Sequence, residues 1–254
     1  LGSGDIGLIM ARRMTLEGME VEGVYEVMSS LGGLRRNAVQ CLEDYDIPLH
    51  LSTTVTWVHG ERRLEGVTVS QVDRDRKPVP GTERYIPCDL LVLAVGLIPE
   101  NELSKQAGIL LDPVTKGPVV DESCMTSVEG IFAAGNVAAV FDLVDYVSQT
   151  GEQAARGAAR YLAGRLDTTS PYVTLCRGEN VGAILPQRVR PTNLEGALPV
   201  FLRVTMPIRG SVLEWTGEEG AVACRRRYPV ALPPEMLCCE IPKEAVTAGL
   251  TVSV

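Results

Sequence analysis

The first fifty residues alternate between the helical and the strand spacing of apolar side chains. Residues 2–16 carry apolar side chains at intervals that place them on one helix face. These side chains are Ile6, Ile9, Met10 and Met14. Residues 21–26 alternate as a half-buried strand does, and residues 34–45 and 47–51 predict a second helix and a short strand. This order predicts an α/β unit that opens on a glycine turn.

Before residue 100, the chain returns to strand patterns. Three short runs separated by turn signals predict a three-stranded meander. The runs are residues 53–58, 65–72 and 83–86. Residues 89–95 follow as an unbroken apolar run, which is typical of a strand buried on both faces. We therefore expect a layered α/β unit with a meander inserted before its last strand.

Beyond Pro99 the pattern changes twice. Short strands are predicted at residues 119–120 and 130–134, and an alanine-rich helix at residues 146–162. From about residue 167, strands alternate with Pro and Gly at the spacing of an all-β domain. The predicted strands are residues 200–205, 212–215, 221–230, 237–241 and 250–254. We expect a small all-β, sandwich-like domain there.

Composition narrows the possible functions. The 254 residues hold 24 Lys and Arg against 32 Asp and Glu, and this net charge of −8 argues against a nucleic-acid partner. The longest apolar stretch, residues 90–98, is too short to span a bilayer, so we expect no membrane span and a cytoplasmic protein. Seven Cys without a C-x-x-C pair and only two His predict no disulfide framework and no metal site.

The chain opens on the pattern G-x-G-x-x-G. Its residues are Gly2, Ser3, Gly4, Asp5, Ile6 and Gly7. The first glycine permits a tight turn, the second lets backbone approach a pyrophosphate, and the third lets helix and strand pack closely. The helix that follows would offer its first amides to the phosphates. A structural glycine turn in an unrelated βαβ unit is the other interpretation.

Glu26 supports the interpretation as a nucleotide site. It ends the predicted strand 21–26 and lies 19 residues after Gly7, where an acid can bond the ribose 2′-hydroxyl of NAD and repel a 2′-phosphate. Arg35 and Arg36 would reach an NADP phosphate only if the loop folds back, and we expect them on the exposed face of the helix. We therefore predict NAD rather than NADP.

Two later segments add a resemblance. Residues 89–101 (DLLVLAVGLIPEN) and 126–137 (TSVEGIFAAGNV), with the helix that contains residues 151–155 (GEQAA), occur after the glycine turn in the order seen in the pyridine-nucleotide-dependent flavoprotein oxidoreductases. The chain resembles this family over residues 1 to about 165. The resemblance implies that the first segment closes an NAD domain and that the second binds the ribityl chain of FAD.

The resemblance also implies cofactor-binding residues beyond the glycine turn and Glu26. These are Gly96, Gly135, Asn136, Val137, Asp142 and Val144, of which residues 142–144 would touch the isoalloxazine. Asn136 stands where the family has an acid, so one charge-assisted bond is lost. The redox dithiol of the disulfide reductases is missing. The chain is more similar to the branch without it, which includes the FAD/NAD subunits of opine oxidase and of sarcosine oxidase-like enzymes; residues 2–14 and 95–103 carry this likeness.

The resemblance implies a domain plan. We expect a Rossmann-like NAD-binding domain at residues 1–99 whose first strand is missing, the C-terminal half of an FAD-binding domain at residues 100–166, and a β-rich domain at residues 167–254. The strand before Gly2 and the N-terminal half of the FAD domain would belong to a longer flavoprotein.

The implied activity is hydride transfer between NAD(H) and FAD, with electrons passed to a partner oxidoreductase subunit or a small-molecule acceptor, in an oligomeric enzyme. The cofactors carry such chemistry, so no catalytic side chain is predicted. An NAD-only dehydrogenase and a non-catalytic nucleotide-binding scaffold remain as alternatives. The basic run at residues 225–227 is either a solvated strand or a docking patch for an acidic partner.

Overall fold

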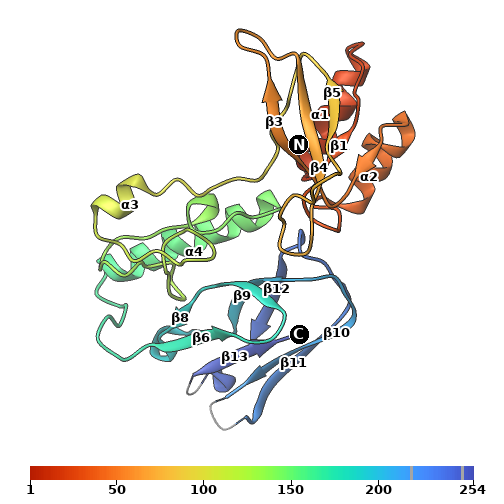
Figure 1. Cartoon of the computed structure of the whole chain (residues 1–254). Coiled ribbons are helices and arrows are strands. Elements are labelled where there is room, and N and C mark those ends of the chain that lie inside the picture. The colour runs from red at the N-terminus through yellow and green to blue at the C-terminus, as the bar shows by residue number, and fades with distance from the viewer. Residues whose placement is uncertain (218–219, 247–248) are drawn as a thin grey trace. The chain divides into compact units, whose positions relative to one another are not determined.

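The computed structural model describes residues 1–217, 220–246 and 249–254 (Figure 1). The chain divides into two compact units, Leu1–Gly96 and Leu97–Val254.

The first unit is built on short parallel strands. Strand β1 (Val24–Tyr25) pairs in parallel with β2 (Leu49–His50). On the other side of β1, the Gly2 amide donates to the Tyr25 carbonyl over 2.7 Å, and the Ala94 amide donates to the Leu1 carbonyl over 2.7 Å. Leu1 and Gly2 therefore lie between β1 and the segment around Ala94. The order of these four segments matches the 3-2-1-4 strand order of a Rossmann sheet, but only β1 and β2 are regular strands.

Two helices and a 3-10 turn accompany this sheet. They are α1 (Asp5–Leu16), α2 (Arg35–Cys41) and η1 (Glu43–Tyr45). Leu8 and Ala11 of α1 pack with Val24 and Ala38 in one buried cluster. The predicted helix over residues 34–45 is divided into α2 and η1, because Leu42 leaves the regular helical geometry. Asp46, in a left-handed conformation, ends η1.

The predicted meander is confirmed. Strands β3 (Thr53–His59), β4 (Gly66–Gln71) and β5 (Arg84–Pro87) form an antiparallel sheet in chain order. Their apolar face packs on Tyr25, through Val67, Val69 and Ile86.

The apolar run 89–95 does not form the predicted buried strand. No regular strand is assigned to it, and Leu93 and Val95 are 65% and 68% exposed. Leu1 is the only residue that bonds to its backbone within the described part of the chain. An apolar sequence shows which residues favour burial but not whether a neighbour covers them, and this prediction was wrong for that reason.

The second unit begins with helices and irregular segments. Its helices are α3 (Glu102–Gln106), the 3-10 turn η2 (Gly135–Val137) and α4 (Val144–Leu162). The predicted helix over residues 146–162 is confirmed and starts two residues earlier. The predicted strands at 119–120 and 130–134 are wrong: around them the backbone forms only isolated bridges, Leu111 with Pro118 and Met125 with Phe132.

Residues after about 170 form two sheets. The five-stranded sheet has the order β11-β10-β13-β6-β8 and the three-stranded sheet the order β12-β9-β7. The strands are β6 (Val173–Arg177), β7 (Val181–Leu185), β8 (Arg188–Val189), β9 (Leu198–Val204), β10 (Ile208–Thr216), β11 (Val222–Ala231), β12 (Leu237–Ile241) and β13 (Leu250–Ser253). Two 3-10 turns, η3 (Pro191–Asn193) and η4 (Lys243–Ala245), interrupt them.

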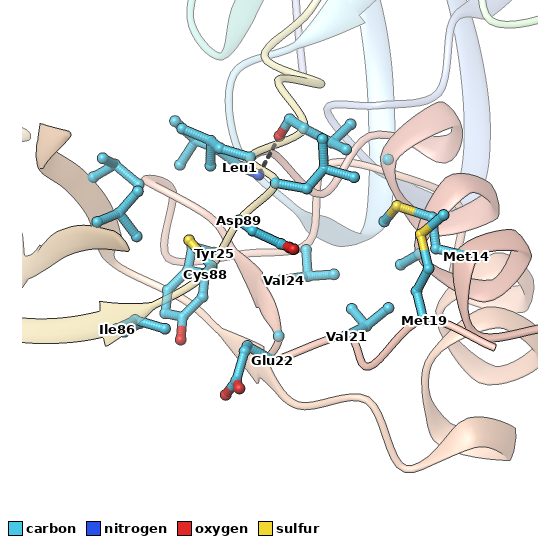
Figure 2. Close-up of a pocket in the computed structure, with 18 of the residues that line it drawn as sticks. Leu1, Met14, Met19, Val21, Glu22, Val24, Tyr25, Ile86, Cys88 and Asp89 are labelled. Carbon is cyan, nitrogen blue, oxygen red and sulfur yellow. Dashed lines mark hydrogen bonds between the residues drawn. The ribbon is translucent and has the colours of Figure 1, made fainter. Parts of the chain in front are cut away.

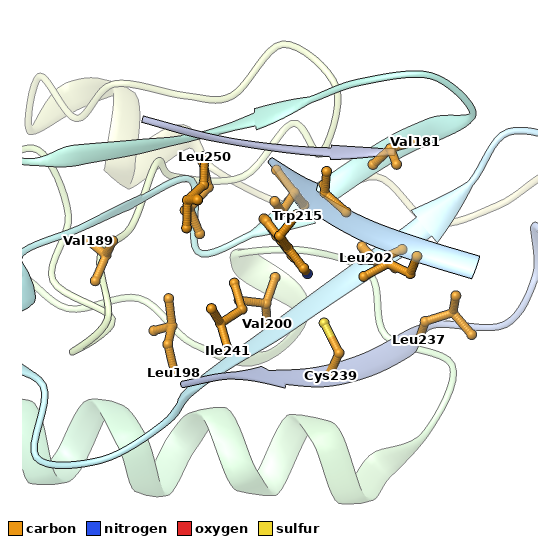
Figure 3. Close-up of a cluster of buried hydrophobic side chains, with 14 of the residues drawn as sticks. Val181, Val189, Leu198, Val200, Leu202, Trp215, Leu237, Cys239, Ile241 and Leu250 are labelled. Atoms are coloured by element: carbon orange, nitrogen blue, oxygen red, sulfur yellow. The ribbon is translucent and has the colours of Figure 1, made fainter. Parts of the chain in front are cut away.

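The two sheets share one apolar core. Trp215 from one sheet and Leu202 and Ile241 from the other are fully buried in it (Figure 3). Each predicted strand of this region corresponds to one of β9–β13, whereas β6, β7 and β8 were not predicted. These three are short and are separated by Gly178 and Pro186, so no alternating pattern develops.

Candidate functional site

The glycine turn uses two of its glycines for packing within the protein. Gly2 has φ +96°, and a Cβ there would overlap the Ala94 carbonyl oxygen. A Cβ at Gly7 would lie 2.7 Å from the Gly2 carbonyl oxygen and 2.9 Å from the Ala94 Cβ. Any larger residue at these positions must displace backbone, so both glycines are required by the fold itself.

Gly4 differs from the other two glycines. A Cβ at this position would meet only the Ala94 carbonyl oxygen, at 3.9 Å. Gly4 is the N-cap of α1, and no side chain caps this helix. In the described part of the chain, the amides of Asp5, Ile6 and Gly7 donate to no protein acceptor. The open space beside Gly4 and the free amides therefore fit the pyrophosphate of a dinucleotide.

Glu26 is bound to the glycine turn. The side chain is 7% exposed, and its Oε2 accepts bonds from the Ser3 amide at 2.9 Å and the Ser3 hydroxyl at 2.7 Å. Its Oε1 accepts a bond from the Met28 amide at 2.8 Å. The structure thus brings together the turn and the acid that the sequence had paired. A carboxylate offers about four acceptor sites, so one remains on Oε1.

Ser3 and Asp5 also hold the loop of residues 27–34. The Ser3 hydroxyl accepts a bond from the Gly32 amide at 2.8 Å. The Asp5 Oδ1 accepts bonds from the Leu34 amide at 2.8 Å and from the Asn37 side-chain amide at 2.7 Å. Both residues belong to the predicted motif, but this role was not predicted. Ser3 and Asp5 occupy two of the variable positions of G-x-G-x-x-G. Short polar side chains at these positions could have indicated hydrogen bonds to a neighbouring loop.

The two arginines near the loop point elsewhere. Arg35 pairs with Glu43 at 2.7 Å on the surface, and Arg36 is exposed. The expectation that both lie on the exposed face of the helix is confirmed. Ile6 is exposed as well, whereas Ser3 is fully buried.

A large cavity of the first unit is a separate feature. It has a volume of about 840 Å³ and lies between residues 20–24 and residues 89–92 (Figure 2). Met14 of α1 and Ile86 of β5 also line it, but Gly4 and Glu26 do not. In the described part of the chain, no backbone amide of residues 20–23 or 89–93 donates a hydrogen bond. The cavity therefore has unpaired backbone amides along two walls, and it lies apart from Gly4 and Glu26.

Leu1 closes one end of this cavity. Its backbone nitrogen donates to the Val92 carbonyl over 2.7 Å. Because Gly2 bonds to Tyr25 on the other side, the two walls stand there about two strand spacings apart, or about 10 Å.

The second motif forms a turn against α4. Gly135 has φ +61°, and its amide donates to the Thr150 hydroxyl over 3.0 Å. Asn136 is exposed, and its Oδ1 accepts a bond from the Phe141 amide at 3.1 Å. The Val137 carbonyl accepts a bond from the buried Asn101 side chain at 3.0 Å. Asn101, the last residue of the segment 89–101, was not predicted to hold this turn.

Helix α4 starts close to this turn. Val144 is its first residue and is 74% exposed, and no side chain caps the helix. Within the described residues, the Val144 and Asp145 amides have no acceptor. Asp142 is not free: its carboxylate accepts bonds from the Met236 amide at 3.1 Å and from Arg203 at 3.3 Å. The exposed Asn136, the free amides and the left-handed Gly135 fit a polar cofactor close to backbone.

Gly96 stands apart from these groups. It is the last residue of the first unit, has φ +103°, and a Cβ there would meet nothing within 4 Å. Its part in cofactor binding stays a prediction.

The cysteines offer no reactive pair. All seven are free thiols, and burial raises the pKa of Cys124 and of Cys239 to about 12. The described residues contain no group of His, Cys, Asp and Glu that would hold a metal ion.

The comparison with protein families fits this geometry. Residues 1–160 match the family described as pyridine nucleotide-disulphide oxidoreductase. The chain belongs to this family. Family members are oxidoreductases that generally bind FAD and NAD(P)H, and they share the Rossmann-like fold of the first unit.

The sequence similarity to individual relatives covers only part of this chain and part of each relative. The chain is 33% identical over 174 residues to the beta subunit of an NADP(+)-dependent formate dehydrogenase from Moorella thermoacetica. The aligned region covers 61% of this chain and 23% of that protein. It is 32% identical over 127 residues to the thioredoxin reductase of Treponema pallidum. This aligned region covers 49% of this chain and 38% of that protein.

Among solved structures, T. acidophilum thioredoxin reductase superposes with a TM-score of 0.54 and 30% identity, over 64% of this chain and 51% of that one. The chain therefore spans about half of that structure and less of the two sequence relatives. Among the described residues, no helix is both long and apolar enough to cross a membrane.

Proposed function

We propose that this chain is part of an FAD-dependent oxidoreductase that transfers hydride between NAD(H) and the flavin and passes the electrons to a partner subunit or a small-molecule acceptor. The observation that carries the proposal is the open position beside Gly4, at the uncapped start of α1, with Glu26 held against the same turn. An isolated structural turn has no need of space there.

NAD is the nucleotide that fits this turn. The free amides of Asp5 and Ile6 would bind the pyrophosphate at the positive end of the α1 dipole. The remaining acceptor site of Glu26 would take a bond from a ribose 2′-hydroxyl, whereas a 2′-phosphate would meet a negative charge. The surface ion pair of Arg35 with Glu43 leaves that arginine engaged away from the turn.

The second motif supports the flavin part of the proposal. Bound FAD would supply a two-electron hydride acceptor. Because the Asn136 oxygen already accepts the Phe141 amide, its NH₂ group is free to donate to the ribityl chain. The free amides at the start of α4, with the exposed Val144 beside them, would favour negative charge on a reduced flavin.

The domain plan is part of the proposal. We assign residues 1–99 to NAD binding, residues 100–166 to half of an FAD domain, and residues 167–254 to a β-rich domain. The cavity beside Leu1, with unpaired backbone on two walls, supports the expectation that this sheet takes one more strand.

Cofactor analysis of the natural polypeptide that contains these residues tests the function. We expect it to carry FAD whose visible absorption is bleached by NADH at least tenfold faster than by NADPH. A flavin-free protein that still binds NADH would instead be an NAD-only dehydrogenase. A protein that binds neither cofactor would be a scaffold, and both results contradict the proposal.

A further inference from the structure

The β sheets at the end of the chain hold the start of α4 through one arginine. Arg203 lies in β9, and its guanidinium donates to the carbonyls of Pro233 at 3.1 Å, Pro234, and Val140 at 3.2 Å. The same group meets the Asp142 carboxylate at 3.3 Å. One side chain thus joins a strand, a loop and the segment that leads into α4.

Apolar contacts surround the Arg203 joint, which is the set of contacts of Arg203 with residues 140, 142, 233 and 234. The Phe141 and Tyr146 rings pack edge-on against Phe201, with ring centroids 5.4 Å and 5.2 Å away. Phe201 and Met236 come from the β sheets and their loop, and they share a buried cluster with Phe141. Residues 140–146 are therefore fixed by polar and apolar contacts to the same two elements.

The joint is also connected to the second motif. Asn136 accepts the Phe141 amide, and Gly135 donates to Thr150 of α4. Directly after the buried Phe141 and the half-buried Asp142, the chain emerges at the exposed Val144. The position and direction of the free amides at the start of α4 thus depend on contacts made by Arg203.

The charges at this joint balance. The Arg203 side chain is only 22% exposed, and Asp142 is the one carboxylate paired with it in the described part of the chain. Burial lowers the pKa of Arg203, and the Asp142 charge opposes this effect. Removing either partner leaves the other as a poorly solvated charge beside the helix start.

We infer that Arg203 is a positioning residue for the flavin: paired with Asp142, it makes the C-terminal β sheets the platform that sets both the geometry and the charge at the start of α4. This inference rests on the proposed function, because that function locates FAD at this helix. It gives the β-rich part of the chain a role in tuning the cofactor.

Opposite shifts of the flavin reduction potential would identify this role. Arg203→Met leaves the Asp142 carboxylate unpaired, and the added negative charge should lower the potential. Asp142→Asn leaves the guanidinium unpaired and should raise it. We expect a tenfold change in the oxidised-to-reduced ratio in each direction, which is about 30 mV for a two-electron couple. A merely structural pair would shift stability in both variants but would not give opposite signs.

The natural polypeptide with its bound FAD is the protein to measure, by dye-equilibrated reduction followed in the visible spectrum. Arg203→Lys keeps the charge and should restore most of the wild-type potential. Arg225→Met is the matched control, because it removes an exposed pair with Glu214 in the same unit and should leave the potential unchanged.

The outcomes distinguish a failure of the proposed function from a failure of the inference about Arg203. A wild-type protein without FAD overturns the proposed function and the inference with it. A wild-type protein with FAD whose two variants shift in the same direction, or no more than the Arg225→Met control, overturns the inference alone. If Arg203→Met does not fold, the expected rise in Asp142→Asn decides: a potential equal to the control refutes the positioning role.

Discussion

The Ser3 hydroxyl donates to the Glu26 carboxylate over 2.7 Å and accepts a bond from the Gly32 amide over 2.8 Å. The second residue of the glycine motif therefore connects the turn, the acid at the end of β1 and the loop after it. We propose all three as parts of the dinucleotide site.

Ser3→Ala should loosen this connection. The variant leaves the Gly32 amide without an acceptor and removes one of three bonds to the buried Glu26. We expect a loss of about 1–3 kcal/mol in unfolding free energy and weaker NADH binding. Urea unfolding and NADH titration measure the two effects.

Thr15→Ala is a control for the loss of a hydroxyl. In the described part of the chain, the Thr15 hydroxyl bonds only within α1, to the Ala11 carbonyl, so its removal should leave NADH binding unchanged. NADH binding by Ser3→Ala that equals that of the control would contradict the role assigned to Ser3.

Gly4→Ala and Gly7→Ala should have different effects. A Cβ at Gly7 meets Gly2 and Ala94 inside 3 Å, so this variant should lose about 1–3 kcal/mol of stability through overpacking. A Cβ at Gly4 enters open space and should change the melting temperature little while blocking the pyrophosphate. Thermal unfolding and NADH titration of both variants test this. Equal melting temperatures for the two variants would show that the distinction is mistaken.

The sequence predicted the parts of the site that depend on local spacing. The glycine turn and Glu26 were found because the motif encodes a tight turn and the strand after it has a fixed length. The bond from Ser3 to Gly32 and those from Asp5 to Leu34 and Asn37 were not found, because the path of an aperiodic loop depends on tertiary contacts.

Two other misses have the same physical origin. Arg203 and Asp142 are 61 residues apart, and no spacing rule joins a strand residue to a loop residue at that distance. The run 89–95 was predicted to be buried from its apolar side chains alone, yet Leu93 is largely exposed because nothing in the described structure covers it.

Glu26→Ser should change the nucleotide preference. The smaller neutral side chain removes the negative charge that would face a 2′-phosphate, and it removes an acceptor for the 2′-hydroxyl. We expect the ratio of NADH to NADPH dissociation constants to move at least tenfold toward NADPH. Fluorescence titration of both nucleotides checks this.

Glu22→Ser is the matched control, because Glu22 lies on the same extended segment but lines the cavity rather than the turn. An unchanged preference in Glu26→Ser would remove the basis for assigning NAD.

The adjacent carboxylates Asp121 and Glu122 should make the second unit sensitive to pH. Burial raises the pKa of both above their ordinary values of 3.8 and 4.5, and for Glu122 the neighbouring Asp121 charge adds to this. A carboxyl whose folded pKa is raised stabilises the fold most below its unfolded pKa, and this contribution is lost as pH rises through the folded pKa. Stability from these groups should therefore fall from about pH 4 upward.

Glu122→Gln isolates this effect. The variant removes one titrating group and the repulsion it exerts on Asp121, so the melting temperature of Glu122→Gln relative to wild type should rise as pH increases from about 4 to 7. A constant offset is also expected, since the carboxylate accepts bonds from the Arg190 amide and from Asn193. Calorimetry across this range, with the exposed Glu152→Gln as control, gives the slope. A difference that is flat with pH, or that falls as pH increases, would refute the assigned titration.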